Sequence, residues 1–326
     1  MKKTYVIAEI GVNHNGDINK AKKLINVAKK IGADCVKFQA YKSNEIVLKN
    51  CDLANYQKKL RFKNQFDMLK KYELSEKQLI DLNNFSKKKK IDFMLSVFDV
   101  SSFKFDQKIK NKYLKIPSGE ITNYPLLKLC SKTRKRIILS TGASNLKEIK
   151  NAVKIINKKN IILLHCNSAY PTPIEDMNLN NLIMFKKYFK NFKVGLSDHS
   201  RSVLIPMVAT GMGAEFIEKH ITLDNKSIGP DHKSSLSPKD YKNMIENIRL
   251  ADKSKGSFKR KISSSEKINR KIIRKYIVAK TTIKKGSKLN KNNLTTKRTN
   301  GGVSAINWIK LIGTKAKRNY NLDDKL

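Results

Sequence analysis

The chain has 326 residues, of which 40% are hydrophobic, 8% aromatic and 29% charged. This length predicts about two domains, and the composition is that of a globular protein. No apolar run reaches the roughly 20 residues that cross a bilayer, and the apolar start Thr4–Ile10 is short and contains Glu9, which argues against a signal peptide. We therefore expect a cytoplasmic protein with no membrane partner.

The formal charge is +42, from 69 Lys and Arg against 27 Asp and Glu. Such an excess is typical of proteins that bind nucleic acids or anionic surfaces. Here, however, the lysines are spread along the whole chain, and no basic run is interleaved with the aromatic residues that stack on single strands. We expect an anionic substrate and no nucleic-acid partner, with a non-catalytic basic anion- or nucleic-acid-binding protein as the alternative.

The four cysteines show no C-x-x-C spacing; they are Cys35, Cys51, Cys130 and Cys166. This pattern supports neither a disulfide framework nor a structural zinc site. It indicates reduced thiols in a reducing compartment.

Strand-like and helix-like segments alternate along the first 250 residues. Helical spacing of apolar residues covers Ile18–Ile31 and Glu76–Lys88, while residues 41–74 are predicted to be irregular. The strand-like segments are Thr4–Ile10, Cys35–Phe38, Ile91–Val97, Tyr113–Pro117, Arg136–Thr141, Ile161–Cys166, Lys193–Leu196 and Ala214–Lys219. Eight strands with helices between them, each followed by polar residues, predict a (β/α)8 TIM barrel.

The domain boundaries follow from the same pattern. The barrel is predicted to form a catalytic domain over residues 1–252, with a last helix at Pro238–Leu250. Residues 253–275 are polar and rich in serine and lysine, which predicts a linker. Residues 276–326 are predicted to form a small β-rich domain with a thin core that leans on a partner surface.

Two histidines follow neighbouring strand-like segments near the end of the barrel. His199 follows the seventh strand, His220 ends the eighth, and Leu204–Met212 between them is predicted to be a helix. A strand–helix–strand unit of this kind is a right-handed crossover, so both strand ends point the same way. We expect the two imidazoles to lie together at the carboxyl edge of the barrel, where α/β folds place their sites.

Polar residues at the other strand ends suggest a cradle for an anion. Lys37 and Lys115 end apolar strands, where an ammonium is costly unless it meets an anion; an ion pair with Glu9 or Glu120 is the alternative. Hydroxyls at equivalent positions come from Ser96, Ser118, Ser140 and Ser197. Together these groups suit a phosphate or carboxylate. The acid–base candidates in the same mouth are Glu9, Glu120 and Asp231.

These motifs together resemble the sialic acid (N-acetylneuraminate) synthase family over nearly the full chain. The matching stretches are Ala8–Gly16, Val36–Gln39, Lys115–Pro125, Leu139–Gly142, His165–Cys166, Tyr170–Pro173, Ser197–His199, Ile217–Thr222 and Gly229–His232. The tail resembles the antifreeze-like (SAF) domain that these enzymes carry, including Thr295–Arg298. The resemblance implies a TIM barrel followed by a small antifreeze-like β-rich domain.

The resemblance also implies a reaction. Phosphoenolpyruvate condenses with an N-acyl hexosamine, expected to be N-acetylmannosamine, and phosphate leaves by C–O cleavage. A legionaminic acid synthase, or a synthase that uses a 6-phosphorylated N-acyl sugar, is the alternative, because Asn167–Tyr170 differs from many bacterial sialic acid synthases.

Site roles are carried over by the same resemblance. His199 and His220 are expected to hold Mn²⁺ or Mg²⁺. The phosphoenolpyruvate site is expected to comprise Lys37, Gln39, Ser96, Lys115, Ser118, Ser140, Ser168 and Ser197. Sugar binding and proton transfer are expected to involve Glu9, Glu120, Tyr170 and Asp231. Arg298 is expected to reach the N-acyl group from the other subunit of a domain-swapped homodimer, although Thr299-Asn300 replaces the usual Pro-Gly after it.

Overall fold

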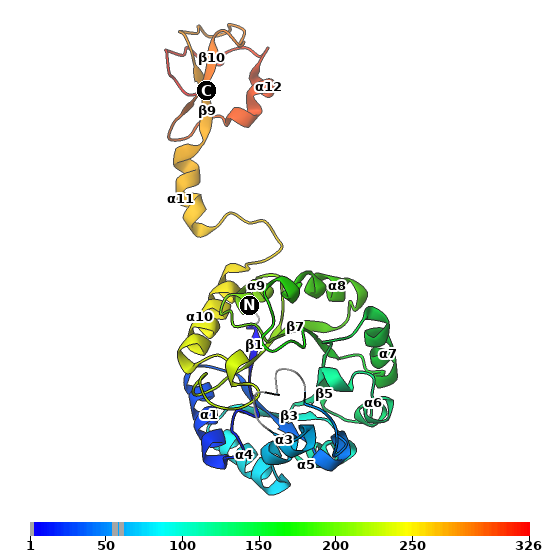
Figure 1. Cartoon of the computed structure of the whole chain (residues 1–326). Coiled ribbons are helices and arrows are strands. Elements are labelled where there is room, and N and C mark those ends of the chain that lie inside the picture. The colour runs from blue at the N-terminus through cyan, green and yellow to red at the C-terminus, as the bar shows by residue number, and fades with distance from the viewer. Residues whose placement is uncertain (1–2, 54–57, 59–61) are drawn as a thin grey trace. The chain divides into compact units, whose positions relative to one another are not determined.

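The structure, a computed structural model, describes residues 3–53, 58 and 62–326. These residues form two compact units that divide between Gly256 and Ser257. In the described part of the first unit, eight parallel strands close into a barrel in chain order (Figure 1). The strands are β1 (Tyr5–Gly11), β2 (Cys35–Ala40), β3 (Asp92–Val97), β4 (Tyr113–Ile116), β5 (Arg136–Ser140), β6 (Ile162–Cys166), β7 (Lys193–Asp198) and β8 (Phe216–His220). The predicted (β/α)8 barrel is therefore confirmed.

Helices surround the strands on the outside of the barrel (Figure 1). They are α1 (Ile18–Lys30), α4 (Glu76–Lys88), α5 (Val100–Lys108), α6 (Tyr124–Cys130), α7 (Leu146–Ile156), α8 (Asn180–Tyr188), α9 (Ile205–Gly211) and α10 (Pro238–Ser254). Short 3-10 turns follow three of the strands; they are η2 (Ser118–Glu120), η3 (Glu175–Met177) and η4 (His232–Ser234). Local signals fix several starts: α4 begins at a capping box in which Ser75 and Gln78 each accept the other's backbone N–H.

Apolar side chains fill the barrel in two layers. The larger layer lies between the strands and the outer helices, with fully buried residues such as Leu24, Leu82 and Ile248. The smaller layer fills the interior near the amino ends of the strands, with Ile7, Met94 and Phe216. The interior at the carboxyl ends is polar instead, which leaves that end of the barrel for chemistry.

The segment 41–74, predicted to be irregular, contains two short helices. These are α2 (Ser43–Ile46) and α3 (Gln65–Tyr72), while residues 54–57 and 59–61 lie outside the described part. Helix α3 begins where the Asn64 side chain accepts the backbone N–H of Asp67 at 2.8 Å. An N-cap asparagine is a local signal that the sequence interpretation passed over.

The second unit has its own small core. Strands β9 (Lys275–Ala279) and β10 (Leu294–Arg298) pair antiparallel, and η5 (Ala305–Asn307) and α12 (Trp308–Leu311) follow. Its buried residues include Ile277, Leu294 and Tyr320. The segment predicted to be a linker contains helix α11 (Ser264–Ile273), because Ser263 and Glu266 form a capping box.

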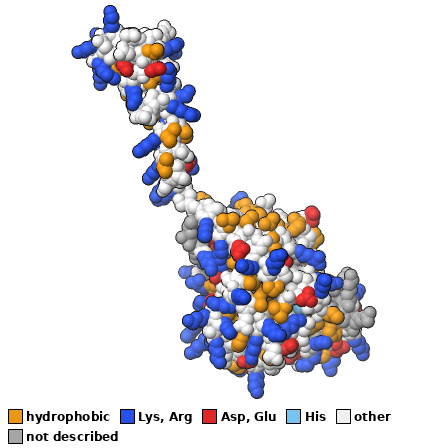
Figure 2. Space-filling model, turned by 90° about the vertical axis from the view of Figure 1, so that its left-hand side faces the viewer, with side chains coloured by type: hydrophobic (Ala, Val, Ile, Leu, Met, Phe, Trp, Pro, Cys, Tyr) orange, Lys and Arg blue, Asp and Glu red, His pale blue; other side chains and the backbone are white. Residues whose placement is uncertain are grey.

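Lysine and arginine side chains are scattered over the visible face of the protein and do not gather in one patch (Figure 2). This distribution agrees with the even spread of lysine along the sequence. Among the described residues, no helix has both the length and the apolar character that a membrane crossing requires.

A fully buried ion pair joins the carboxyl ends of β7 and β8. Lys219 Nζ lies 2.5 Å from Asp198 Oδ2 and donates to the backbone oxygen of Ser200 at 2.7 Å. Both side chains are 0% exposed. His199 directly follows Asp198, and His220 directly follows Lys219. The ion pair therefore fixes the two histidines relative to each other.

We predict that Lys219→Met destabilises the fold by about 3–5 kcal/mol, because it leaves Asp198 buried and uncompensated. Urea unfolding measures the loss. The control is Lys242→Met on α10, whose ion pair with Glu246 is exposed and is expected to contribute less than about 1 kcal/mol. Equal effects of the two substitutions would contradict a structural role for the buried pair.

Two buried histidines order the loops after β1 and β8, and one of them, His232, joins the two loops. His14 Nδ1 accepts the backbone N–H of Gly16 at 2.9 Å. His232 Nε2 lies 3.1 Å from Asn15 Oδ1, and its Nδ1 lies 2.7 Å from Thr222 Oγ1. Burial lowers the pKa of each histidine to about 4. Both rings are therefore neutral in the folded protein at pH 7.

We predict that the free energy of unfolding falls as the pH decreases from 6.5 to 4. In this range the unfolded chain binds a proton at His14, whose ordinary pKa is about 6.5, whereas the folded chain does not. His14 alone contributes a loss on the order of 1–3 kcal/mol. Urea unfolding at pH 7 and pH 4.5 should show a smaller loss for His14→Gln than for the wild type; an equal loss would refute this assignment.

Candidate functional site

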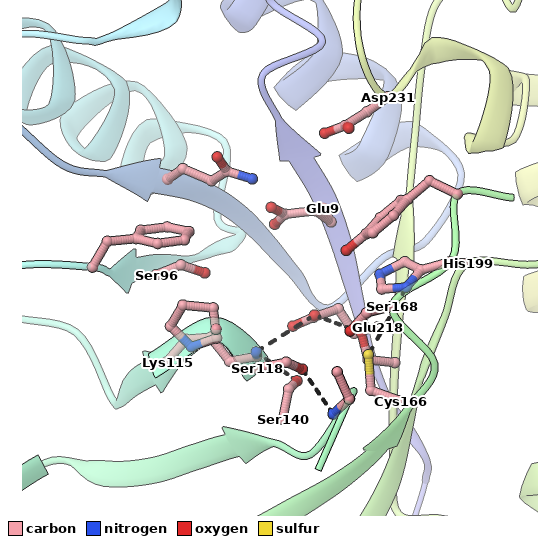
Figure 3. Close-up of a pocket in the computed structure, with 18 of the residues that line it drawn as sticks. Glu9, Ser96, Lys115, Ser118, Ser140, Cys166, Ser168, His199, Glu218 and Asp231 are labelled. Carbon is pink, nitrogen blue, oxygen red and sulfur yellow. Dashed lines mark hydrogen bonds and ion pairs between the residues drawn. The ribbon is translucent and has the colours of Figure 1, made fainter. Parts of the chain in front are cut away.

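A cavity of about 620 Å³ lies at the carboxyl ends of the barrel strands. Residues of every strand or of the loop after it line the cavity, and Figure 3 shows many of these side chains converging. Most of the site residues predicted from the sequence lie here; they are Glu9, Lys37, Gln39, Ser96, Lys115, Ser118, Ser140, Ser168, Tyr170, Ser197, His199, His220 and Asp231. The barrel thus gathers groups that are far apart in the sequence.

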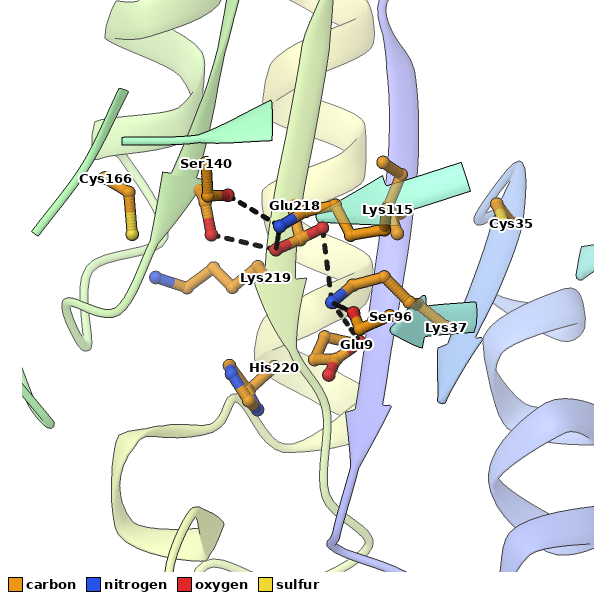
Figure 4. Close-up of polar contacts among 12 residues, drawn as sticks. Glu9, Cys35, Lys37, Ser96, Lys115, Ser140, Cys166, Glu218, Lys219 and His220 are labelled. Atoms are coloured by element: carbon orange, nitrogen blue, oxygen red, sulfur yellow. Dashed lines mark hydrogen bonds and ion pairs between the residues drawn. The ribbon is translucent and has the colours of Figure 1, made fainter. Parts of the chain in front are cut away.

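A cluster of buried charges forms the floor of the cavity (Figure 4). Lys37 Nζ lies 2.9 Å from Glu9 Oε2 and 3.5 Å from Glu218 Oε2, and Lys115 Nζ lies 3.8 Å from Glu218 Oε1. Hydroxyls complete the contacts: Lys37 donates to Ser96 at 2.8 Å and Lys115 to Ser140 at 2.7 Å. The ion-pair alternative for Lys37 therefore holds with Glu9, and Glu218 bridges the two lysines.

Burial and these charges together set the protonation states. Burial opposes ionisation of Glu218, but Lys115 and Lys37 outweigh it, so its pKa is lowered. Burial raises the pKa of Glu9 to about 7, although Lys37 opposes the shift. Burial lowers the pKa of Lys115. Two lysines thus face one carboxylate whose pKa is lowered and one carboxyl whose pKa is raised, so the cluster favours an added anion.

Hydroxyls and a backbone N–H surround the Lys115 side of the cavity. Gly142 donates its N–H to Ser118 Oγ at 2.9 Å. A Cβ on Gly142 would lie 2.3 Å from Ser168 Oγ and 2.9 Å from Ser118 Oγ, so only glycine lets these groups approach. A positive charge with several donors around it is suited to bind a phosphate or a carboxylate.

The two histidines meet across the ends of β7 and β8, as predicted. Their ring centroids lie 5.4 Å apart, and the Tyr170 ring lies 4.1 Å from that of His199. His199 Nδ1 lies 2.6 Å from the backbone oxygen of Asn167, which leaves Nε2 as the ring nitrogen that can accept a ligand. His220 Nδ1 is buried, has no hydrogen-bond partner among the described residues, and lies 3.6 Å from Asp231 Oδ2.

These features fit a divalent metal. Burial, and then the charge of His199, lowers the pKa of His220 well below 6.5, which keeps the ring in the neutral form that binds metals. Within the described residues no group of three or more His, Cys, Asp and Glu side chains forms a metal cage. The site therefore fits only an ion that completes its coordination with water and substrate oxygens, as Mg²⁺ commonly does.

Asp231 lies on the His220 side of the cavity. Its backbone oxygen accepts the hydroxyls of Ser234 at 3.0 Å and Ser235 at 2.6 Å, which fixes the loop. Burial raises the pKa of its carboxyl to about 6. A carboxyl with a pKa near neutrality is suited to donate or accept a proton during catalysis.

One predicted site residue of the first unit, Glu120, does not line this cavity. The Glu120 carboxylate accepts a hydrogen bond from Asn123 Nδ2 at 2.6 Å and is not among the lining residues. Arg298 ends β10 in the second unit. Their roles stay predictions.

The sequence interpretation also missed lining residues, above all Glu218 and Cys166. Glu218 alternates with Phe216 and His220 along β8, and this period of two would have placed all three on one face. Cys166 Sγ lies 3.9 Å from His199 Nδ1. No local pattern marks that cysteine, because only the closed barrel brings it to the histidine.

Known proteins resemble this chain over most of its length. The sequence model of the NeuB family matches residues 24–260, and that of the SAF domain matches residues 274–321. The chain is 44% identical to the N,N'-diacetyllegionaminic acid synthase of Campylobacter jejuni, with 99% of each chain covered. It is 31% identical to the human N-acetylneuraminate-9-phosphate synthase, with 90% of this chain and 82% of that protein covered.

A crystal structure of the N-acetylneuraminic acid synthetase of Leptospira borgpetersenii in complex with citrate has the same fold. It is 34% identical, superposes with a TM-score of 0.73, and the match covers 82% of this chain and 90% of that one. The family resemblance inferred from the motifs is confirmed. The chain belongs to the NeuB family and carries a C-terminal SAF domain.

Proposed function

We propose that this protein condenses phosphoenolpyruvate with an N-acylated amino sugar to give a nine-carbon 2-keto acid and phosphate. One observation carries the proposal: an anion cradle and a histidine pair suited to a metal line the same cavity. Family membership supports the reaction class, because relatives are named as synthases of such acids.

In this proposal phosphoenolpyruvate occupies the charged floor of the cavity. Lys115, with the hydroxyls of Ser118, Ser140 and Ser168, binds its anionic groups. The other predicted contacts come from Lys37, Gln39, Ser96 and Ser197. A divalent cation held by His199 and His220, Mn²⁺ or Mg²⁺, would supply Lewis-acid polarisation of the sugar aldehyde.

The carboxyl groups account for the protons of the reaction. The C3 carbon of phosphoenolpyruvate forms a bond to the aldehyde carbon, whose oxygen takes a proton from Asp231. Water then adds at C2 and gives a proton to Glu9. The C2–O bond to phosphate breaks, and the second proton of the water passes to the departing phosphate as C2 becomes the keto carbon. The pKa values of about 6 for Asp231 and about 7 for Glu9 suit these roles.

The sugar is best assigned as one with two N-acetyl groups. The relative named as a diacetyllegionaminic acid synthase is 44% identical, whereas the human N-acetylneuraminate-9-phosphate synthase is 31% identical. N-acetylmannosamine, the sugar expected from the sequence, is the second candidate. A phosphate-release assay that offers phosphoenolpyruvate with each sugar, and weighs the product, distinguishes them.

We predict that phosphate release needs both a sugar and a divalent ion. Chelation should abolish turnover and added Mn²⁺ should restore it, because the aldehyde loses its polarising charge without the ion. His220→Ala should lose activity that Mn²⁺ does not restore, whereas Lys242→Met on the exposed face of α10 should retain it. Full activity after exhaustive chelation would refute the metal role, and the absence of phosphate release with every sugar would refute the synthase.

We further propose that Arg298 acts on the sugar of the other subunit in a homodimer. A guanidinium offers fixed donors that suit an acyl carbonyl. The small core of the second unit and the exposed end of β10 support a role against another surface.

We predict that two inactive proteins, Arg298→Ala and His220→Ala, complement each other once their subunits exchange. Each mixed dimer then holds one site with both an intact barrel and an intact arginine, so activity should reach about a quarter of the wild-type site count. The control mixes each variant with itself. If subunit exchange is demonstrated and no activity returns, Arg298 does not act in trans.

A further inference from the structure

One wall of the cavity differs in character from the charged floor. Val12, in the loop after β1, and Met68, Leu69 and Tyr72 of α3 line this side. Their side chains pack in one apolar cluster, in which Val12, Met68 and Tyr72 are 5%, 2% and 4% exposed. We call these four residues the α3 wall.

The α3 wall is held in place by several contacts. The Tyr41 hydroxyl donates to the backbone oxygen of Leu69 at 2.9 Å. Gly16 has a positive φ of 79°, and a Cβ there would lie 3.0 Å from the backbone oxygen of Lys71, so the β1 loop packs directly on α3. The wall is therefore a preformed surface, as in most small-molecule sites.

The α3 wall adjoins Asp231 rather than the anion cradle. Val12 directly follows Gly11, at which a Cβ would lie 3.3 Å from Asp231 Oδ2. In Figure 3, Asp231 lies on the opposite side of Glu9 from Ser118 and Ser140. If phosphoenolpyruvate occupies the cradle, the part of the sugar beyond its aldehyde lies toward the α3 wall.

We propose that the α3 wall selects a sugar that presents apolar substituents, such as a second N-acetyl methyl, over a fully hydroxylated N-acyl hexosamine. This inference rests on the proposed condensation. The side chains of Val12, Met68 and Leu69 in this wall offer no strong hydrogen-bonding group, so a sugar hydroxyl that faces them loses its water without replacement, whereas a methyl group gains by burial. A hydrophobic pocket discriminates in this way by about 10- to 200-fold.

The test compares kcat/KM for a diacetamido hexose and for N-acetylmannosamine. We expect the wild type to prefer the diacetamido sugar by at least about tenfold. Met68→Gln and Val12→Thr keep side-chain size but add polar atoms, and each should lower that preference severalfold while KM for phosphoenolpyruvate stays unchanged. The control is Leu250→Gln on α10, which is 62% exposed and does not line the cavity.

Each outcome separates this inference from the proposed function. No phosphate release from the wild type with either sugar would overturn the condensation itself. Phosphate release in which the wild type prefers N-acetylmannosamine would overturn the proposed selectivity of the α3 wall and leave the condensation standing. A sugar preference that is unchanged in both variants would do the same. Thermal unfolding checks that the variants fold; if Met68→Gln does not, Val12→Thr and the half-buried Leu69→Gln carry the same comparison.

Discussion

Two lysines inside the barrel determine which charged groups must surround them at the carboxyl ends of the strands. Lys37 and Lys115 are 4% and 2% exposed, and an ammonium removed from water is tolerated only beside an anion. Glu9 and Glu218 supply the negative charge from β1 and β8, the two strands that close the barrel. Burial raises the pKa of Glu9 to about 7, which weakens the negative charge that faces the lysines. The fold alone tolerates these lysines, but a bound anionic ligand would compensate their positive charge more fully.

The spacing of the two histidines depends on a second buried charge pair, formed by the residues that precede them in the sequence. Lys219 and Asp198 tie together the two strand ends that present His220 and His199. In the proposed metal site only two protein ligands hold the ion, so their spacing must come from the scaffold. The scaffold also keeps the rings close to Asp231 and Tyr170, where a polarised carbonyl could receive a proton.

Sequence reasoning succeeded where chemistry follows strand periodicity and failed where packing decides. The meeting of His199 and His220 followed from the handedness of one crossover, and the barrel followed from eight repeated units. Glu218 was overlooked because its strand was interpreted as an apolar run instead of being divided into two faces. The α3 wall had no comparable signal, since Val12 and Met68 meet only after the β1 loop packs on α3. Helix α11 begins at a capping box that can be recognised in the sequence. The segment was nevertheless predicted to be a linker, because its polar composition was given more importance than the capping box.

The net charge of +42 and the buried lysines act over different distances. Surface lysines spread over the molecule raise the local concentration of any anion, but salt screens them within about 8 Å at physiological ionic strength. They cannot distinguish one anion from another. Lys37 and Lys115 differ from them, because they are desolvated and their ammonium groups are held in place by Ser96 and Ser140. Selectivity for the ligand therefore arises inside the barrel, whatever the surface attracts.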